Sequence, residues 1–320
     1  MRSLAFILFA AACGSSPAAP DGGGGKIDGT TTGSDGSIKV YMDAPASSAN
    51  LTVFTIILEN HDYNEIVGSA NAPYFNSLIA QGALATKYKD TNHPSLPNYV
   101  HMISGADQYP GFIDIDPTQA PYFPADQPNL GTQLEAAAIP WRSYQEGTTS
   151  PCQLTTAGNY APKHDPFLYF KDQQMGANNL CANTNVDYSS FAADLAANTY
   201  RYIWITPSLV DDGHDPSTDP VAALKASDTW LSTEVPKILA SDAYHHGGIL
   251  FITWDESEGR NGDDPDLIPM LVMSSSLPHP GSTNTTAFTH SSYLATIEDL
   301  FHLPRLATVT ATPSLMPLMQ

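Results

Sequence analysis

The stretch LTVFTIILENHD, residues 51–62, contains the pattern that decides the fold. Its first part, 51–58, is a continuous run of apolar and β-branched residues, which is typical of a strand buried on both faces of a sheet. The polar residues Glu59 to Asp62 follow without a break. Because open parallel sheets bind their ligands beyond the carboxyl ends of the strands, the residues directly after such a run are the first candidates for a functional site.

Strand-like and helix-like segments alternate along the rest of the chain. Further strands are expected at 83–90, 201–206, 247–254 and 268–274, and helices at 72–83, 97–105, 129–138, 221–241 and 291–303. This alternation predicts an α/β domain over 51–320, with a mostly parallel central sheet and helices on both faces. The segment 106–188 is rich in proline, glycine and tyrosine, and we expect it to form an irregular, cap-like insertion over the site.

The N-terminal residues, 1–13, resemble a short export signal that ends in a lipoprotein box. A positive charge precedes the apolar run 4–12, which is too short to span a bilayer, and small residues precede Cys13. We expect a lipid anchor on Cys13, as the protein's contact with a membrane, and an outer-membrane or cell-surface location. The alternative is an ordinary cleaved signal and a periplasmic or secreted protein. Residues 14–50 have the composition of a flexible tether.

Two cysteines remain beyond the signal, Cys152 and Cys181. In an oxidising compartment, two leftover cysteines in loop-like sequence are expected to form a disulfide. The alternative is a pair of free buried thiols.

The charge of the chain argues against one class of partner. It has 33 acidic and 13 basic residues and a net charge of −20. Such a charge repels a phosphate backbone, so we expect no nucleic-acid partner.

Acidic and histidine side chains gather where the predicted strands end. Glu59 and Asn60 follow the first strand, Asp255 and Glu256 follow the strand 247–254, the sequence DDGHD follows the strand 201–206, and His290 precedes the last helix. Carboxylates at one point repel each other unless a cation or a proton holds them together. Oxygen ligands suit Ca²⁺, Mg²⁺ or Mn²⁺. Any one of these motifs could be a turn or a helix cap, but the whole set is harder to explain that way.

The sequence HPSLPNY, residues 93–99, places a serine between two prolines at a predicted helix start. A helix that begins at Leu96 and Pro97 would make Ser95 its N-cap residue. Backbone N–H groups and the helix dipole bind anions at this position. A hydroxyl there, beside a metal ion, could be a nucleophile that faces a phosphate-sized anion. The alternative is that Ser95 only caps the helix.

In this order, the segments LENHDYNEIVG, HPSLPNY, KHDPFLYF, DDGHD and ITWDE resemble the phosphoesterase family of bacterial phospholipases C and acid phosphatases, within the alkaline phosphatase superfamily. The sequence HSSYLATIEDLFHLPRL also resembles the ending of that family, so the resemblance covers about 51–307. It implies an alkaline-phosphatase-like fold and the hydrolysis of a phosphoric ester, either a monoester or a phospholipid diester.

The resemblance also implies a role for each candidate residue. Ser95 would be the nucleophile and form a phosphoseryl intermediate, while His214 and His290 would bind phosphate or transfer protons. The ligands of one divalent cation would be Glu59, Asn60, Ser95, Asp255 and Glu256. Contacts with the substrate would come from Asn60, Lys163, His164 and Asp215. The sequence Asp-Glu at 255–256, where two-metal members have Asp-His, favours Ca²⁺, Mg²⁺ or Mn²⁺ over zinc.

Three other functions remain as alternatives. A sulfate-ester hydrolase of the same fold would need C/S-x-P-x-R, but position 99 is a tyrosine. An acyl hydrolase would need G-x-S-x-G, which HPSLP does not match. A surface-binding lipoprotein that has lost catalysis is the third, and the intact Ser95, Glu59 and Asp255 argue against it.

Overall fold

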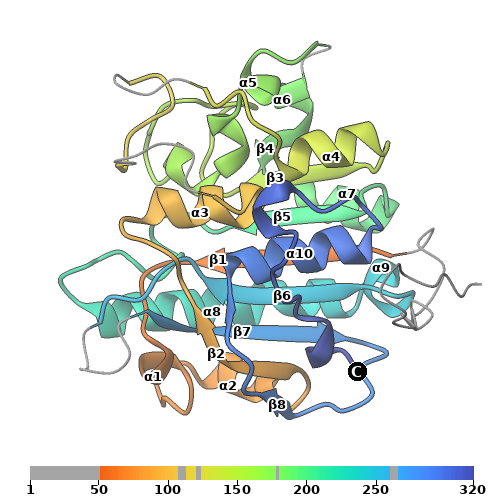
Figure 1. The fold of residues 1–320 in the computed structure, drawn as a ribbon. Coiled ribbons are helices and arrows are strands. Elements are labelled where there is room, and N and C mark those ends of the chain that lie inside the picture. The colour runs from red at the N-terminus through yellow and green to blue at the C-terminus, as the bar shows by residue number, and fades with distance from the viewer. Residues whose placement is uncertain (1–50, 107–112, 120–123, 178–179, 260–265) are drawn as a thin grey trace, which may run out of the picture. The chain divides into compact units, whose positions relative to one another are not determined.

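The computed structural model describes residues 51–106, 113–119, 124–177, 180–259 and 266–320 (Figure 1). These residues belong to one compact unit, 44–320. The predicted signal, Cys13 and the predicted tether lie outside the described residues. None of the helices in the described part of the chain has both the length and the apolar character that crossing a bilayer would require.

A nine-stranded sheet forms the centre, in the order β4-β3-β5-β1-β6-β7-β2-β8, with β9 also paired to β2. The wholly buried strand β1 (Val53–Leu58) lies between β5 (Tyr202–Thr206) and β6 (Ile249–Trp254), and all three are parallel. Only β7 (Leu267–Ser274) runs against its neighbours, β6 and β2 (Ala83–Lys89). The remaining strands are β3 (Trp141–Gln145), β4 (Asn185–Asp187), β8 (Ser282–Asn284) and β9 (Phe288–Thr289). The predicted mostly parallel sheet is therefore confirmed.

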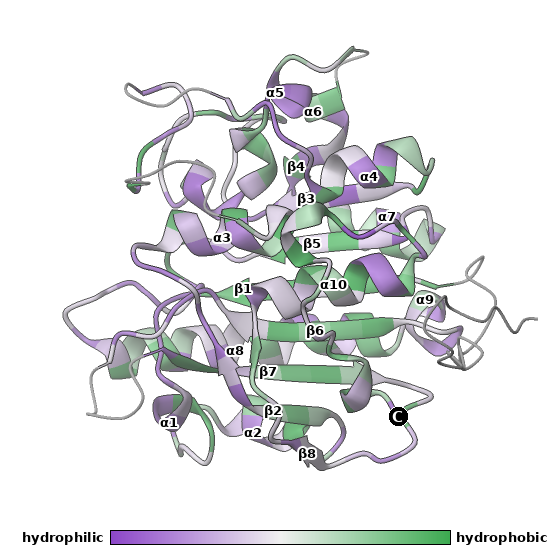
Figure 2. Ribbon diagram, in the orientation of Figure 1, coloured by the Kyte–Doolittle hydropathy of each residue, from purple (hydrophilic) through white to green (hydrophobic). Residues whose placement is uncertain are grey.

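Helices cover both faces of the sheet, as predicted. In Figure 1, α3 (Ser95–Ser104) and α10 (His290–Leu300) lie in front of the sheet, and α8 (Pro220–Leu239) lies behind it. The other helices are α1 (Tyr63–Ile66), α2 (Pro73–Ile79), α4 (Leu130–Ala136), α5 (Lys171–Gln174), α6 (Leu180–Thr184), α7 (Phe191–Ala197) and α9 (Asp242–His245). Figure 2 shows β6 and β7 as hydrophobic along their length, which agrees with strands that are covered on both faces.

The segment 106–188 is less irregular than predicted, because it adds two strands to the sheet. β3 pairs in parallel with β5, and β4 pairs in parallel with β3. β3 was not predicted because its sequence, WRSYQ, has no continuous apolar run. Its polar residues are satisfied by hydrogen bonds instead: Arg142 contacts Asp194, and Gln145 donates to the carbonyl of His164. The rest of the described segment forms turns and short helices, which include the 3-10 helix Pro162–His164.

The predicted disulfide between Cys152 and Cys181 is present, with 5.3 Å between the two Cα atoms. It joins a turn after β3 to α6, and the two cysteines are 29 residues apart in sequence.

Closing a loop of this length should restrict the unfolded chain. We expect the double variant Cys152→Ser/Cys181→Ser to lose about 3–4 kcal/mol of unfolding free energy on the chain-entropy account, measured by urea denaturation. Wild-type protein in reductant is the control and should lose the same amount. Two free thiols in a peptide digest of protein made in an oxidising compartment would rule the bridge out.

Candidate active site

The parallel pairing of β1 and β6 brings the predicted carboxylates together. Leu58 pairs with Trp254, so Glu59 and Asp255 leave the sheet at the same edge. Glu59 and Asp255 are 0% exposed and Glu256 is 3% exposed. These groups lie at the carboxyl ends of the parallel strands. Open α/β sheets bind their ligands at this edge.

Asn60 turns the chain at the end of β1. Its φ is 49°, in the left-handed region that asparagine tolerates better than most residues. Its backbone N–H donates to Asp255 Oδ1 at 3.1 Å, and its side-chain Nδ2 donates to Glu256 Oε1 at 3.3 Å. The amide NH₂ therefore faces Glu256, and the role of the Asn60 oxygen as a metal ligand stays a prediction.

Ser95 points into the carboxylates and does not cap its helix. α3 begins at Ser95 itself, with Pro94 at the N-cap and no side-chain cap, so the helix starts one residue before Leu96, the start that an N-cap role for Ser95 would require. Ser95 Oγ lies 3.1 Å from Glu59 Oε2 and 3.0 Å from Glu256 Oε1. A hydroxyl has one proton, so it can donate to only one of the two at a time. The structure therefore does not support the helix-cap alternative.

Lys163 reaches the nucleophile candidate from the segment 106–188. Its Nζ lies 3.4 Å from Ser95 Oγ and 2.7 Å from Asp114 Oδ2. Asp114 Oδ1 also accepts a hydrogen bond from the Leu96 N–H at 3.0 Å. Asp114 was not predicted from the sequence, because no local pattern around it indicates a contact with Lys163, which lies 49 residues further along the chain.

His164 lies behind the site and does not line it. It is buried, and its Nε2 is 3.0 Å from Glu59 Oε1. Its ring stacks on Tyr99 of α3, with 5.3 Å between ring centroids. The prediction gave His164 a substrate contact, whereas the structure places it as a support for Glu59.

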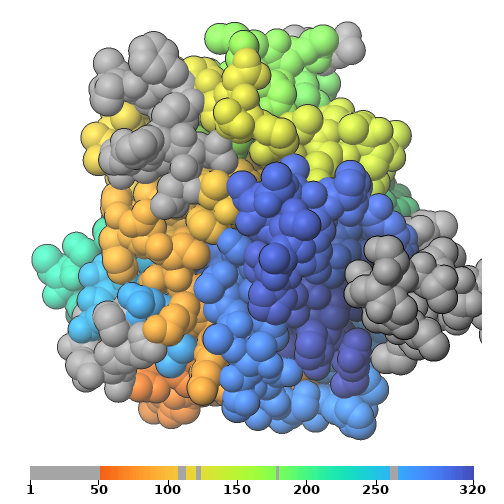
Figure 3. All heavy atoms as spheres, in the orientation of Figure 1, coloured from red at the N-terminus to blue at the C-terminus, as the bar shows by residue number. Residues whose placement is uncertain are grey.

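A cleft of about 510 Å³ opens over Ser95. Its walls include Asn60, His93, Ser95, Asp114, Lys163, His214 and Glu256. His214 Nδ1 lies 3.1 Å from Asp215 Oδ1, and the Asp215 side chain is 45% exposed at the edge of the site. Figure 3 shows the segment around α3 (orange) beside the segment after β6 (light blue) at the surface.

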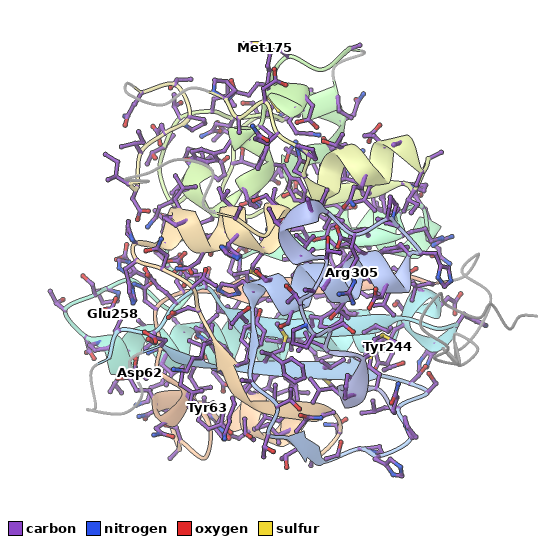
Figure 4. All side chains as sticks on the ribbon, in the orientation of Figure 1. Asp62, Tyr63, Met175, Tyr244, Glu258 and Arg305 are labelled. Carbon is purple, nitrogen blue, oxygen red and sulfur yellow. A yellow bond between two sulfur atoms is a disulfide. The ribbon has the colours of Figure 1, made fainter. Side chains whose placement is uncertain are left out.

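The loop after β6 is held by Asp62, which follows β1. Asp62 Oδ1 accepts hydrogen bonds from the N–H groups of Glu258 and Gly259, at 2.7 and 2.9 Å. Figure 4 shows Asp62 and Glu258 close together. The ends of β1 and β6 therefore stay joined beyond the sheet.

His290 lies outside the cleft, contrary to the prediction that it contacts phosphate or transfers a proton to it. It is fully buried, with Nε2 2.6 Å from the carbonyl oxygen of Asp255 and Nδ1 2.9 Å from the Tyr88 hydroxyl. Burial lowers the pKa of His290 to about 3, so the ring is neutral. Both ring nitrogens are occupied, which makes His290 a support for Asp255.

The pKa values of the three carboxyl groups shift in opposite directions. Burial raises the pKa of Asp255 well above its ordinary value and that of Glu256 to about 8, and the charge of Glu59 adds to both shifts. Burial also raises the pKa of Glu59, but the positive charges of His164 and Lys163 lower that pKa overall. Asp255 Oδ2 is buried without a hydrogen-bond partner. A divalent cation would remove the cost of keeping these groups ionised, so the donor set fits a metal ion.

A neighbouring group of side chains could also hold a metal ion. Ligand atoms of Asp90, His93 and Asp266 lie within 4.8 Å of one another. His93 Nδ1 is 2.5 Å from Glu256 Oε2, so this group adjoins the predicted one. Sequence reasoning missed it, although Asp90 follows β2 at the same edge of the sheet and Asp266 precedes the antiparallel β7.

The fold is similar to that of a solved protein of the alkaline phosphatase superfamily. That protein, from Vibrio parahaemolyticus, matches with a TM-score of 0.55 and 13% identity over 81% of this chain and 68% of that one. This likeness defines the class of fold.

Sequence comparison identifies the family. The profile of the Phosphoesterase family matches residues 69–304, so the chain belongs to this family and is a phosphoric ester hydrolase. It is 26% identical to a phosphatidylinositol-3-phosphatase of Mycobacterium tuberculosis over 86% of this chain and 85% of the relative. It is also 26% identical to a probable acid phosphatase of Kluyveromyces lactis, over 79% of this chain and 58% of the relative. The predicted resemblance and enzyme class are confirmed.

The buried carboxyl groups predict how pH affects the metal-free protein. A carboxyl whose pKa rises from 4.5 to about 8 on folding stays protonated in the folded chain while the unfolded chain ionises. We therefore expect the unfolding free energy of chelated protein to fall between about pH 5 and pH 8. Added Mg²⁺ or Mn²⁺ should raise the melting temperature more at pH 8 than at pH 5. Equal shifts at both pH values would contradict this reading.

Proposed function

We propose that the protein hydrolyses phosphoric monoesters through a phosphoseryl intermediate on Ser95, with one divalent cation. The observation that carries this proposal is the position of Ser95 Oγ in the cleft, 3.0 Å from Glu256 Oε1 and 3.4 Å from Lys163 Nζ. A nucleophile in such a position has a proton acceptor on one side and a positive charge for the phosphoryl oxygens on the other.

A monoester is favoured over a phospholipid diester by the character of the cleft. Its described lining residues are polar or charged except for Pro94, so they include no cluster of apolar side chains that an acyl chain could pack against. The phosphatase names of the relatives from M. tuberculosis and K. lactis also support a monoester.

The cation would be held by Glu59, Ser95, Asp255 and Glu256. Support comes from the burial of all three carboxylates and from the unpartnered Asp255 Oδ2. When bound, a divalent cation lowers the pKa of an attached hydroxyl and offsets negative charge on the phosphoryl group. Oxygen-only ligands favour Mg²⁺, Mn²⁺ or Ca²⁺.

The chain's own residues would carry the phosphoryl transfer as follows. Ser95 Oγ gives its proton to a carboxylate oxygen that it contacts, forms a bond to phosphorus, and the bond from phosphorus to the ester oxygen breaks. Lys163 Nζ donates to the phosphoryl oxygens, and His214 in the cleft wall gives a proton to the departing alcohol. Water then attacks the phosphorus and gives a proton to His214, the bond from phosphorus to Ser95 Oγ breaks, and the carboxyl group returns its proton to Ser95 as phosphate leaves.

Two buried histidines would act as positioning residues. His290 contacts the backbone carbonyl of Asp255, and His164 Nε2 lies 3.0 Å from the carboxylate of Glu59. Neither ring borders the cleft in the described residues.

The proposed location is outside the cytoplasm, with a lipid anchor on Cys13. The Cys152–Cys181 disulfide supports an oxidising compartment.

Removing the Ser95 hydroxyl should stop turnover without unfolding the protein. We expect Ser95→Ala to lower kcat by several powers of ten, each worth about 1.4 kcal/mol of barrier. Its unfolding free energy should change by less than about 2 kcal/mol, since the hydroxyl donates one hydrogen bond to a carboxylate and accepts one long hydrogen bond from Lys163. The measurements are p-nitrophenyl phosphate hydrolysis and thermal unfolding.

The matched control is Ser77→Ala, which removes a serine that bonds to Tyr74 on the exposed side of α2. It should turn over like wild type. An acid quench of wild type during turnover should trap phosphoserine at position 95. Normal turnover by Ser95→Ala would contradict the proposed role of Ser95 as the nucleophile.

Removing the cation should stop turnover reversibly. We expect exhaustive chelation to abolish p-nitrophenyl phosphate hydrolysis, because Glu59, Asp255 and Glu256 then lack their counter-charge. Mg²⁺, Mn²⁺ or Ca²⁺ should restore it, while circular dichroism confirms that the chelated protein stays folded. Full activity in protein that elemental analysis shows to be metal-free would contradict metal dependence.

A further inference from the structure

A second cavity, of about 410 Å³, adjoins the catalytic cleft. The two share Asp114, Lys163 and His214 as walls. Lys163 Nζ lies 3.4 Å from Ser95 Oγ, so the shared wall is next to the proposed nucleophile. An ester whose phosphorus meets Ser95 can therefore extend its alcohol into the second cavity.

The rest of the cavity wall mixes polar and apolar residues. Its polar members are Asp116, Gln119, Thr156 and Asp215, and its apolar members are Ile115, Ala161 and Leu209. Asp116 is held in place, because its Oδ1 accepts from the Thr156 hydroxyl at 2.7 Å and its Oδ2 accepts from the Thr156 N–H at 3.0 Å. Carboxylate, amide and hydroxyl groups of this kind can bond to the hydroxyls of a polyol.

The charge of this wall is negative beyond the shared residues. Lys163 is the only lysine or arginine in its described lining, and that ammonium already contacts Asp114 at 2.7 Å. His214 contacts Asp215 at 3.1 Å. An alcohol in the cavity therefore faces the carboxylates of Asp116 and Asp215. The described lining has no further lysine or arginine to neutralise their negative charges.

We propose that this cavity is the site of the leaving alcohol, and that it selects monoesters of polyhydroxy or amino-bearing alcohols over those with a second anionic group. This inference rests on the proposed phosphomonoesterase activity. A positive charge on the alcohol is attracted by Asp116 and Asp215, whereas a second negative charge is repelled by both.

Three sugar phosphates test the proposal, because the alcohol part is positively charged in the first, neutral in the second and negatively charged in the third. Glucosamine 6-phosphate, glucose 6-phosphate and 6-phosphogluconate are each measured as competitors of p-nitrophenyl phosphate hydrolysis, which works whether or not they are turned over. We expect the inhibition constant to rise in that order, by about fivefold at each step. A change of this size is what one partly exposed charge pair contributes to binding. Equal constants, the reverse order or no inhibition by any of them would overturn the proposal.

The double variant Asp116→Asn/Asp215→Asn keeps the shape of the wall and removes its charge. We expect it to bring the three inhibition constants within about twofold of one another. Asp126→Asn is the control, because it removes one carboxylate from an exposed pair with Lys171 outside the cavity and should keep the wild-type order. An unchanged order in the double variant would overturn the proposal. Failure of wild type to hydrolyse p-nitrophenyl phosphate would instead overturn the proposed function.

Discussion

Three buried carboxylates around one hydroxyl are the constraint on which the rest of the structure depends. Glu59, Asp255 and Glu256 have almost no contact with solvent, and two of them touch Ser95. Like charges brought this close out of water strongly oppose folding unless positive charge, protons or hydrogen bonds compensate them. Their surroundings supply such compensation: the Asn60 amides, His164 and Lys163 all lie against the group.

The pairing of the central strands positions these carboxylates. β1 and β6 are wholly buried and lie side by side in parallel, so Glu59 and Asp255 are directed to one place by backbone pairing. His290 then holds the backbone of Asp255 from behind, and α3 delivers Ser95. Because Leu58 pairs with Trp254 at the ends of these strands, the backbones of Glu59 and Asp255 begin next to each other.

Much of this could be predicted from the sequence because apolar runs identify buried strands and the residues that follow them. Glu59, Asp255 and Glu256 were found in this way, and Ser95 was found from its place at a helix start. β3 was missed because its polar residues are paired inside the fold. Asp114, and the supporting positions of His164 and His290, depend on contacts between residues far apart in the chain, which no local pattern records.

The claim that one cation resides among these carboxylates is tested most directly by anomalous X-ray diffraction from crystals grown with Mn²⁺. The neighbouring group of Asp90, His93 and Asp266 provides an internal comparison, since it offers ligand atoms at the same edge of the sheet. We predict an anomalous peak bounded by Glu59, Ser95, Asp255 and Glu256. A peak at Asp90, His93 and Asp266 alone, or no peak at saturating Mn²⁺, would contradict the account.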